Sequence, residues 1–149
     1  MNLYNISFDE YDSDNEMHKR VIDEISKDPY INNYYYDYKL YVDILLEDEN
    51  NKLYVAALRQ EPLGVIGLQK QNGQYLLSFA LTPTKNGDGI GSLMVDAFST
   101  ALLKKHMDIS KIYLHVHPEK DLYRIVATRA GYTKETNTRY YRENQYFLK

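Results

Sequence analysis

The 149-residue chain contains no cysteine. This absence excludes disulfide bonds, thiolate metal sites and cysteine nucleophiles, and it is compatible with a reducing compartment. No apolar run approaches the length that a membrane span needs. The first 17 residues lack both the basic and the apolar segment of a secretory signal. We therefore expect a cytoplasmic protein with no membrane partner.

An excess of basic residues is also missing. The chain has 18 Lys and Arg against 21 Asp and Glu, for a formal net charge of −3. General nucleic-acid binders usually carry a basic excess, so we expect no nucleic-acid partner. Tyrosine is abundant instead, with 16 residues. Its amphipathic side chain suits core edges, pocket walls and interfaces alike, and composition does not choose between them.

The N-terminal part of the chain begins with a short strand and a helix. Residues 2–8 alternate between apolar and polar side chains, as strands do. Ser13 and Glu16 fit a capping box, in which Ser13 caps the helix and Glu16 reciprocates. The helical pattern that follows ends at Asp28-Pro29, because the residue before a proline avoids the helical conformation.

A second helix is expected in the tyrosine-rich stretch from residue 29 to residue 46. Tyr34, Tyr38, Tyr41 and Leu45 recur at helical spacing and would share one face. Such a stripe is typical of a helix that packs on a sheet.

The rest of the chain changes between strand and helix periods. Asn72-Gly73 is typical of a two-residue hairpin turn, and Gly131 fits the position after a helix end. The order is roughly β-α-α-β-β-β-α-β-α-β, a mixed α/β fold with mainly antiparallel strands in a single domain over residues 1–149. The strands are expected at 52–59, 62–70, 74–82, 111–118 and in the tail from 139, and the helices at 90–106 and 119–131.

A glycine-rich loop lies between the third strand of the meander and the following helix. Gly87, Gly89 and Gly91 can take positive φ and let backbone N–H groups approach an anion, and the helix N-terminus favours negative charge. The spacing is neither that of a dinucleotide fingerprint nor that of a Walker loop. A phosphate cradle and a plain structural turn are both compatible with it. The candidate binding residues are Asn86, Gly87, Asp88, Gly89, Ile90, Gly91 and Ser92.

These residues resemble the GNAT N-acetyltransferase family. The family's loop motif, [QR]-x-x-G-x-[GA], corresponds to the stretch from Asn86 to Gly91, with a proline shortly before it at Pro83. A second region of similarity ends at Gly131-Tyr132, so the resemblance covers about residues 52–132. It implies a GNAT-like central sheet flanked by helices, with acetyl-CoA as the co-substrate.

Three positions depart from the family's pattern. Asn86 stands where a Gln or Arg is usual, so one phosphate contact is in doubt. Ala127 stands where many members carry a tyrosine that acts as general acid, and Lys120 replaces a common Asn. The resemblance therefore leaves the general acid unassigned.

The resemblance implies acetyl transfer from acetyl-CoA to a primary amine of a small molecule or protein. The glycine loop would hold the pyrophosphate, and Arg129 would reach a phosphate or the adenine, unless it is a solvated helix residue. A backbone N–H at Phe79, Ala80 or Leu81 would polarise the thioester carbonyl. A non-catalytic module that binds CoA or acyl-CoA is the alternative, and a nucleotide-binding or structural α/β domain is a third hypothesis. A homodimer is compatible with the family and with the many tyrosines.

Candidates for proton transfer come from two elements. His115 and His117 alternate on one strand and share a face. His117 ends that strand, so it is the candidate base, with a hydrogen-bonded structural histidine as the alternative. No third ligand accompanies this pair, so we predict no metal site. Tyr123 is the candidate acid for the departing thiolate, or otherwise a wall of the pantetheine channel.

The amine acceptor is expected to enter from the side of the N-terminal helices. Tyr35, Tyr36, Asp37 and Glu61 are the candidate acceptor residues, and Asp37 would attract a cation. The alternative is that this tyrosine-rich stretch only packs a helix on the sheet.

Overall fold

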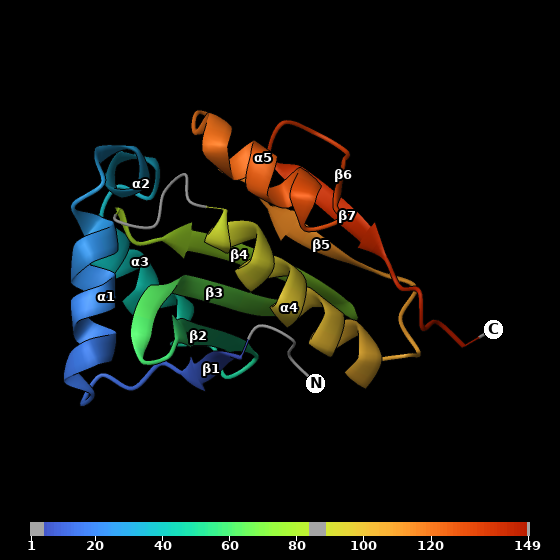
Figure 1. The fold of residues 1–149 in the computed structure, drawn as a ribbon, viewed down its shortest axis with the longest axis horizontal. Helices are drawn as coiled ribbons and strands as arrows, with labels where there is room; N and C mark the ends of the chain where they lie inside the picture. Colours follow the sequence, from blue (N-terminus) through green and yellow to red (C-terminus); the bar gives the residue numbers. More distant parts are fainter. Residues whose placement is uncertain (1–4, 84–88, 149) are drawn as a thin grey trace.

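A seven-stranded mixed sheet forms the centre of the molecule in the computed structural model, which describes residues 5–83 and 89–148 (Figure 1). The strand order is β1-β2-β3-β4-β5-β7-β6. The elements are β1 (Ile6–Glu10), α1 (Glu16–Ser26), α2 (Pro29–Tyr34), α3 (Tyr38–Leu45), β2 (Asn51–Leu58), β3 (Glu61–Gln71), β4 (Gln74–Leu81), α4 (Ile90–Lys105), β5 (Lys111–His115), α5 (Asp121–Arg129), β6 (Thr133–Lys134) and β7 (Arg139–Glu143).

The predicted meander and crossover are confirmed. β1 to β4 pair in antiparallel fashion, and α4 then leads to β5, which pairs with β4 in parallel. Asn72 and Gly73 have φ values of 52° and 77°, as a two-residue hairpin turn requires. β7 pairs antiparallel with β5 on its other side.

β4 and β5 separate soon after they meet. The register pairs only Leu76 with Tyr113 and Leu77 with Leu114. Beyond these two pairs no described residue of β4 is paired with β5, so the two backbones diverge and leave a gap in the sheet, the opening between β4 and β5. In an open sheet the ends of neighbouring strands that separate are a usual position for a ligand site.

Helices cover both faces of the sheet. Gly67 of β3 lies against Ser78 of β4 and Leu45 of α3 on one face. On the other face Phe98 of α4 packs against Tyr54 of β2, with ring centroids 5.1 Å apart. Figure 1 shows α4 and α5 together in front of the sheet. The hydrophobic core therefore lies on both sides of β2, β3 and β4. No helix within the described ranges is long and apolar enough to cross a membrane.

The tyrosine-rich stretch forms two helices, so the prediction of one continuous helix was wrong. α2 ends at Tyr34 and α3 begins at Tyr38. Tyr36 between them has a φ of 66°, which no helix residue adopts. Asp37 then caps α3, because its carboxylate accepts hydrogen bonds from the N–H groups of Lys39 and Leu40.

Smaller differences also have local causes. Asn15, not Ser13, caps α1, since its side chain accepts from the N–H groups of Met17 and His18. β5 ends at His115, so His117 lies beyond the strand. The tail strand stops at Glu143, and β6 was not predicted. The predicted end of the last helix is confirmed: α5 stops at Arg129, and Gly131 follows with a φ of 90°.

Gly64 is the glycine on which the β3–β4 contact depends. A Cβ at this position would lie 2.2 Å from the backbone oxygen of Ala80. We expect Gly64→Ala to lower the free energy of unfolding by about 3 kcal/mol, because backbone cannot yield as a flexible side chain can. Gly73→Ala is the matched control, with no atom within 4 Å of its added Cβ, and should cost about 1 kcal/mol for its left-handed backbone. Urea unfolding measures both, and equal losses would contradict the packing argument.

Candidate active site

The end of β4, the start of α4 and one side of α5 meet at a small pocket of about 30 Å³. Five of the residues predicted for cofactor binding line it together, and three apolar residues of α5 complete the wall. The five are Leu81, Gly89, Gly91, Ser92 and Arg129, and the others are Leu122, Ile125 and Val126. Three further predicted residues, Asn86, Gly87 and Asp88, lie outside the described residues.

The glycines at the start of α4 have different physical roles. Gly89 is the N-cap with a φ of 81°, and an added Cβ would meet no atom of the described residues within 4 Å, so among these residues only its backbone conformation calls for glycine. A Cβ on Gly91 would lie 2.7 Å from Leu81 Cδ1 and 3.3 Å from Val126 Cγ2. Gly91 therefore lets α4 pack closely against β4 and α5. Because Gly89 has no side chain to cap it, the N-terminus of α4 is suited to an anion.

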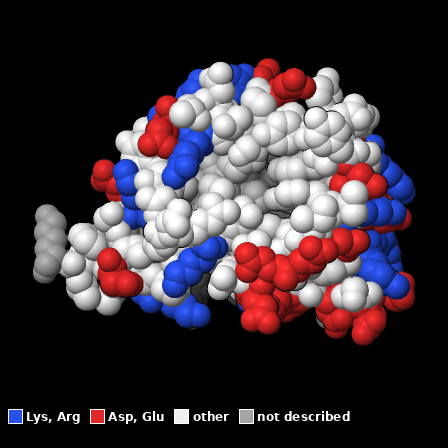
Figure 2. Space-filling model, turned by 180° about the vertical axis from the view of Figure 1, so that it is seen from behind, with Lys and Arg blue, Asp and Glu red and all other residues white. Residues whose placement is uncertain are grey.

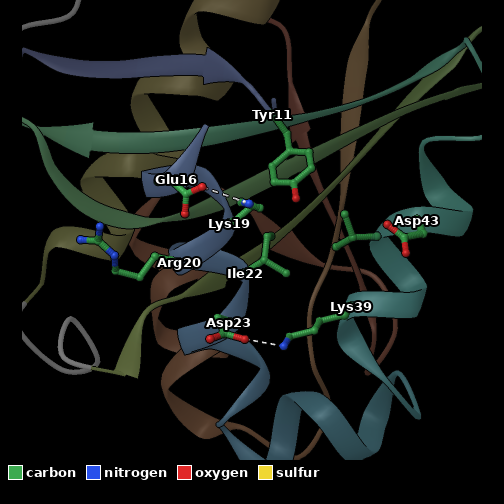
Figure 3. Close-up of a pocket in the computed structure, with 9 residues that line it drawn as sticks. Tyr11, Glu16, Lys19, Arg20, Ile22, Asp23, Lys39 and Asp43 are labelled. Atoms are coloured by element: carbon green, nitrogen blue, oxygen red, sulfur yellow. Dashed lines mark ion pairs between the residues drawn. The ribbon is translucent and has the colours of Figure 1, made fainter. Parts of the chain in front are cut away.

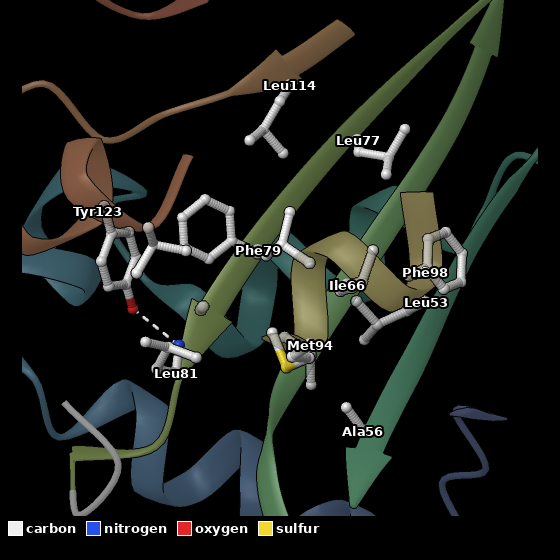
Figure 4. Packing of buried hydrophobic residues seen from close by; sticks show 14 of the residues in the cluster. Leu53, Ala56, Ile66, Leu77, Phe79, Leu81, Met94, Phe98, Leu114 and Tyr123 are labelled. Atoms are coloured by element: carbon white, nitrogen blue, oxygen red, sulfur yellow. Dashed lines mark hydrogen bonds between the residues drawn. The ribbon is translucent and has the colours of Figure 1, made fainter. Parts of the chain in front are cut away.

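One backbone donor of β4 points into the opening beside β5. Thr82 donates its N–H to Leu63 on β3, and alternation along the strand turns the N–H of Leu81 the other way. It donates to the Tyr123 hydroxyl at 2.7 Å (Figure 4). The Tyr123 ring also stacks on Phe79, with centroids 4.6 Å apart. Two predicted residues thus meet: the backbone donor at the end of β4 and the tyrosine of α5.

Tyr123 is held in its neutral form. Its side chain is buried, and burial raises the pKa of its hydroxyl well above the ordinary value. The hydrogen bond from Leu81 opposes this effect only in part. The hydroxyl therefore keeps its proton near neutral pH while its oxygen accepts from Leu81, and it has a proton to give.

His117, the candidate base, is engaged at both ring nitrogens. Nε2 lies 2.9 Å from the carbonyl oxygen of Tyr30, and Nδ1 accepts from the N–H of Glu119 at 3.1 Å. A carbonyl only accepts and a backbone N–H only donates, so the neutral ring carries its proton on Nε2. The side chain is buried as well. This arrangement supports the structural alternative, in which His117 fastens α2 to the loop before α5.

A buried ion pair makes a second connection between α2 and α5. Asp28 and Lys120 form a salt bridge with side chains only 7% and 13% exposed. Asp28 also accepts from the N–H of Tyr30 and so caps α2. Lys120 Nζ lies 5.0 Å from the centroid of the Tyr123 ring. Sequence reasoning missed this pair, although an Asp before Pro29 at a helix start is itself an N-cap signal.

The candidate acceptor residues are not brought together. Tyr35 packs in a ring cluster with Tyr38 and Tyr41, at centroid distances of 5.3 and 4.3 Å. Tyr36 is 94% exposed, whereas the Asp37 carboxylate caps α3. Glu61 is exposed at the first position of β3. Burial raises the pKa of Tyr35, and the hydroxyls of Tyr41, Tyr34 and Tyr123 add to this effect, so Tyr35 lies near Tyr123.

A larger hollow of about 530 Å³ lies between α1 and α3, away from these groups (Figure 3). Four of its charged side chains form two ion pairs: Glu16 pairs with Lys19 at 3.1 Å, and Asp23 pairs with Lys39. It holds none of the residues predicted for the site. Within residues 5–83 and 89–148, no three His, Cys, Asp or Glu side chains are grouped to hold a metal ion.

The Asp28–Lys120 pair should behave as one energetic unit. Lys120→Met leaves the Asp28 carboxylate buried without its partner, and we expect a loss of about 3–5 kcal/mol in the free energy of unfolding. Asp28→Asn in the same chain removes that charge and keeps an acceptor for Tyr30, so the double variant should recover most of the loss. A double-mutant cycle by urea unfolding measures the coupling, and additive losses would show that the two groups are independent.

Comparison with known proteins agrees with this geometry. A sequence model of the acetyltransferase (GNAT) family matches residues 8–132. Among solved structures, the N-acetyltransferase PseH of Campylobacter jejuni, in complex with acetyl coenzyme A, has a TM-score of 0.62 at 14% identity over 91% of this chain and 95% of that one. The RimL alpha-N-protein acetyltransferase in complex with coenzyme A has a TM-score of 0.69 at 16% identity over 96% of both chains.

An acetyltransferase (GNAT family) of Bacillus anthracis has a TM-score of 0.68 at 17% identity over 92% of both chains. No curated protein sequence matches the chain. The structural likenesses show the fold, and the family match extends over most of the sequence. The mixed sheet and the glycine-rich start of α4 agree with this match, and the chain belongs to the GNAT acetyltransferase family.

Proposed function

We propose that the protein transfers the acetyl group of acetyl-CoA to a primary amine of a small molecule or protein in the cytoplasm. The observation that carries this proposal is the Leu81 N–H, which points into the opening between β4 and β5 and meets the Tyr123 hydroxyl at 2.7 Å. A backbone donor and a protonated hydroxyl at one point suit acyl transfer, because the reaction develops charge on a carbonyl oxygen and on a leaving sulfur.

The pocket beside α4 marks where the co-substrate's charged end would lie. The N-terminus of α4 favours the diphosphate, and Arg129 lines the same pocket. The proposed contacts include the loop residues from Asn86 to Asp88 as well as Ile90 and Ser92. The acyl end then lies along β4 near Phe79 and Ala80, with its carbonyl on the Leu81 N–H. Tyr123 must release that N–H when the thioester binds.

The proposed reaction needs three proton transfers, because the amine nitrogen loses two protons and the departing thiolate gains one. An alkyl ammonium, with a pKa near ~10.4, must lose its first proton before its nitrogen can attack. The nitrogen then forms the C–N bond, and the Leu81 N–H stabilises the resulting oxyanion. As the oxyanion collapses the C–S bond breaks, and the Tyr123 hydroxyl, which burial keeps protonated, gives its proton to the departing thiolate. The nitrogen loses its second proton to solvent, and Tyr123 regains one from solvent. Tyr123 acts from one turn before Ala127, where many family members carry their tyrosine.

Figure 2 shows the face opposite α4 and α5, which is hollowed near its centre, with uncharged side chains in the hollow. Acidic side chains gather along one side of the hollow and Lys or Arg side chains lie along the other, so this face carries charge of both signs. A preference for a cationic acceptor is therefore supported only by the formal net charge of −3.

A non-catalytic CoA-binding module is the second candidate. The observation that favours it is the same hydrogen bond, since the Tyr123 hydroxyl occupies the donor that a thioester carbonyl would need. Binding of acetyl-CoA without release of CoA on any amine would support this alternative.

Substitution of Gly89 tests the binding site. We expect acetyl-CoA and CoA, but neither NAD nor ATP, to raise the melting temperature of the wild type. Gly89→Val should abolish this rise by placing a branched side chain where the phosphates would lie. Gly73→Val is the matched control, since both glycines have left-handed φ values, 81° and 77°, with no atom within 4 Å of an added Cβ. Equal acetyl-CoA shifts in the two variants would refute the site.

Substitution of Tyr123 separates acid catalysis from binding. Tyr123→Phe keeps the ring on Phe79 but removes the proton donor and frees the Leu81 N–H. We expect kcat to fall about 10²-fold, while acetyl-CoA binds at least as tightly as in the wild type. Thiol release in a panel of amines measures kcat, and thermal shift measures binding. An unchanged kcat would remove Tyr123 from the mechanism.

A further inference from the structure

The proposed reaction lacks a group that takes the proton of the amine, and the geometry at the end of β5 supplies one. His115 directly follows Leu114, the last residue of β5 that pairs with β4. By alternation its side chain lies on the sheet face opposite Leu114, which is the face that α2 covers. His115 therefore lies where the opening between the two strands begins.

Tyr34 of α2 reaches this histidine. Its hydroxyl lies 2.8 Å from His115 Nε2. Its ring contacts both histidines, with centroids 5.6 Å from His115 and 4.4 Å from His117. Tyr34 and His115 are both partly exposed, whereas His117 is buried. Of the two histidines on this face, His115 is therefore the one that a substrate can approach.

The charge state of the pair suits proton acceptance. Burial and the neighbouring His117 lower the pKa of His115, and burial raises the pKa of Tyr34. Near neutral pH the imidazole is therefore uncharged and the phenol keeps its proton. Arg139, the register partner of His115 on β7, pairs with Glu135 at 3.2 Å and lies over the Tyr113 ring. Arg139, Tyr34 and His117 are thus the titratable or charged groups that face His115 from β7, from α2 and from its own segment.

The pair is continuous with the reaction site. The Tyr34 ring packs edge-on against Tyr35, with centroids 5.0 Å apart. Burial chiefly raises the pKa of Tyr35, and the nearby hydroxyls of Tyr41, Tyr34 and Tyr123 add to this effect. Tyr35 therefore lies near both the Tyr34–His115 pair and Tyr123, which accepts from the Leu81 N–H.

The neighbouring candidates for a base are already engaged. Both nitrogens of His117 are hydrogen-bonded to backbone groups. The Asp28 carboxylate pairs with Lys120, and the Asp37 carboxylate caps α3. His115 Nε2, in contrast, has a hydroxyl partner that can pass a proton in either direction.

Resting on the proposed function, we infer that Tyr34 and His115 remove the proton of the acceptor amine. The Tyr34 oxygen takes a proton from the ammonium as the Tyr34 hydroxyl passes its own proton to His115 Nε2. The products are a neutral amine, ready to attack the thioester, and an imidazolium at His115. The imidazolium returns the proton to solvent after the acetylated amine leaves. Tyr34 touches the substrate, and His115 acts through it.

A matched pair of variants tests the inference. His115→Gln keeps a hydrogen-bond partner for Tyr34 but accepts no proton. His106→Gln is the control, because His106 forms a comparable pair with Tyr75, at 3.4 Å, at the opposite end of β4. The probes are tyramine, spermidine and a tripeptide with a free N-terminus, and the rate is followed by CoA release across a range of pH.

We expect kcat/KM of the wild type to fall as pH drops through the His115 pKa, below the ordinary ~6.5, because the protonated ring accepts nothing. His115→Gln should lower kcat/KM about 10²-fold and lose this fall at low pH, the acidic limb of the pH profile. His106→Gln should keep both the wild-type kcat/KM and the acidic limb. Equal behaviour of the two variants, or an acidic limb that survives in His115→Gln, would overturn the inference. Acetyl-CoA thermal shifts of both variants show whether the co-substrate site is intact, so a failure to bind is recognised separately.

A second measurement needs no turnover. Imidazole 15N spectra of the wild type should show His115 neutral near neutral pH, with Nδ1 protonated and Nε2 as acceptor. Tyr34→Phe should shift the Nε2 resonance of His115 and leave that of His106 in place. A proton on His115 Nε2 in the wild type would refute the inference even if none of the three amines is acetylated.

Discussion

The hydrogen bond from the Leu81 N–H to the Tyr123 hydroxyl is the interaction on which the site depends. It exists because β4 and β5 pair at only two positions and then separate, so the last N–H of β4 has no strand partner. Burial of that donor requires an acceptor, and the phenol of α5 supplies it. The same geometry that satisfies the free donor places a protonated hydroxyl where a thioester would react.

The surroundings of this bond hold α5 and α2 in fixed positions. Lys120 lies against the Tyr123 ring and pairs with Asp28, which also caps α2. His117 binds the carbonyl oxygen of Tyr30 in the same helix. Two buried polar connections therefore tie the short α2, with Tyr34 at its end, to the loop that begins α5. A helix of this length would not be stable alone, so its position depends on these connections.

The two histidines at the end of β5 have different partners although they are only two residues apart. Both nitrogens of His117 bind backbone groups, whereas Nε2 of His115 lies next to the Tyr34 hydroxyl. Sequence reasoning chose His117 because it stood at the expected strand end. The strand in fact stops at His115, and the turn that follows buries His117 against α2.

The sequence by itself determined the meander, the hairpin at Asn72-Gly73, the helix after the glycine loop and the crossover to β5, because period and turn chemistry act over a few neighbouring residues. It also contained the glycine-loop motif on which the resemblance to the GNAT family is based. Only the tertiary structure decided the partners of Tyr123, the partners of the two histidines and the pairing of Lys120 with Asp28. Those contacts join residues 42, 81 and 92 positions apart, as in Tyr123 with Leu81, Tyr34 with His115, and Lys120 with Asp28. No local pattern reports such pairs, since they form only when separate elements pack.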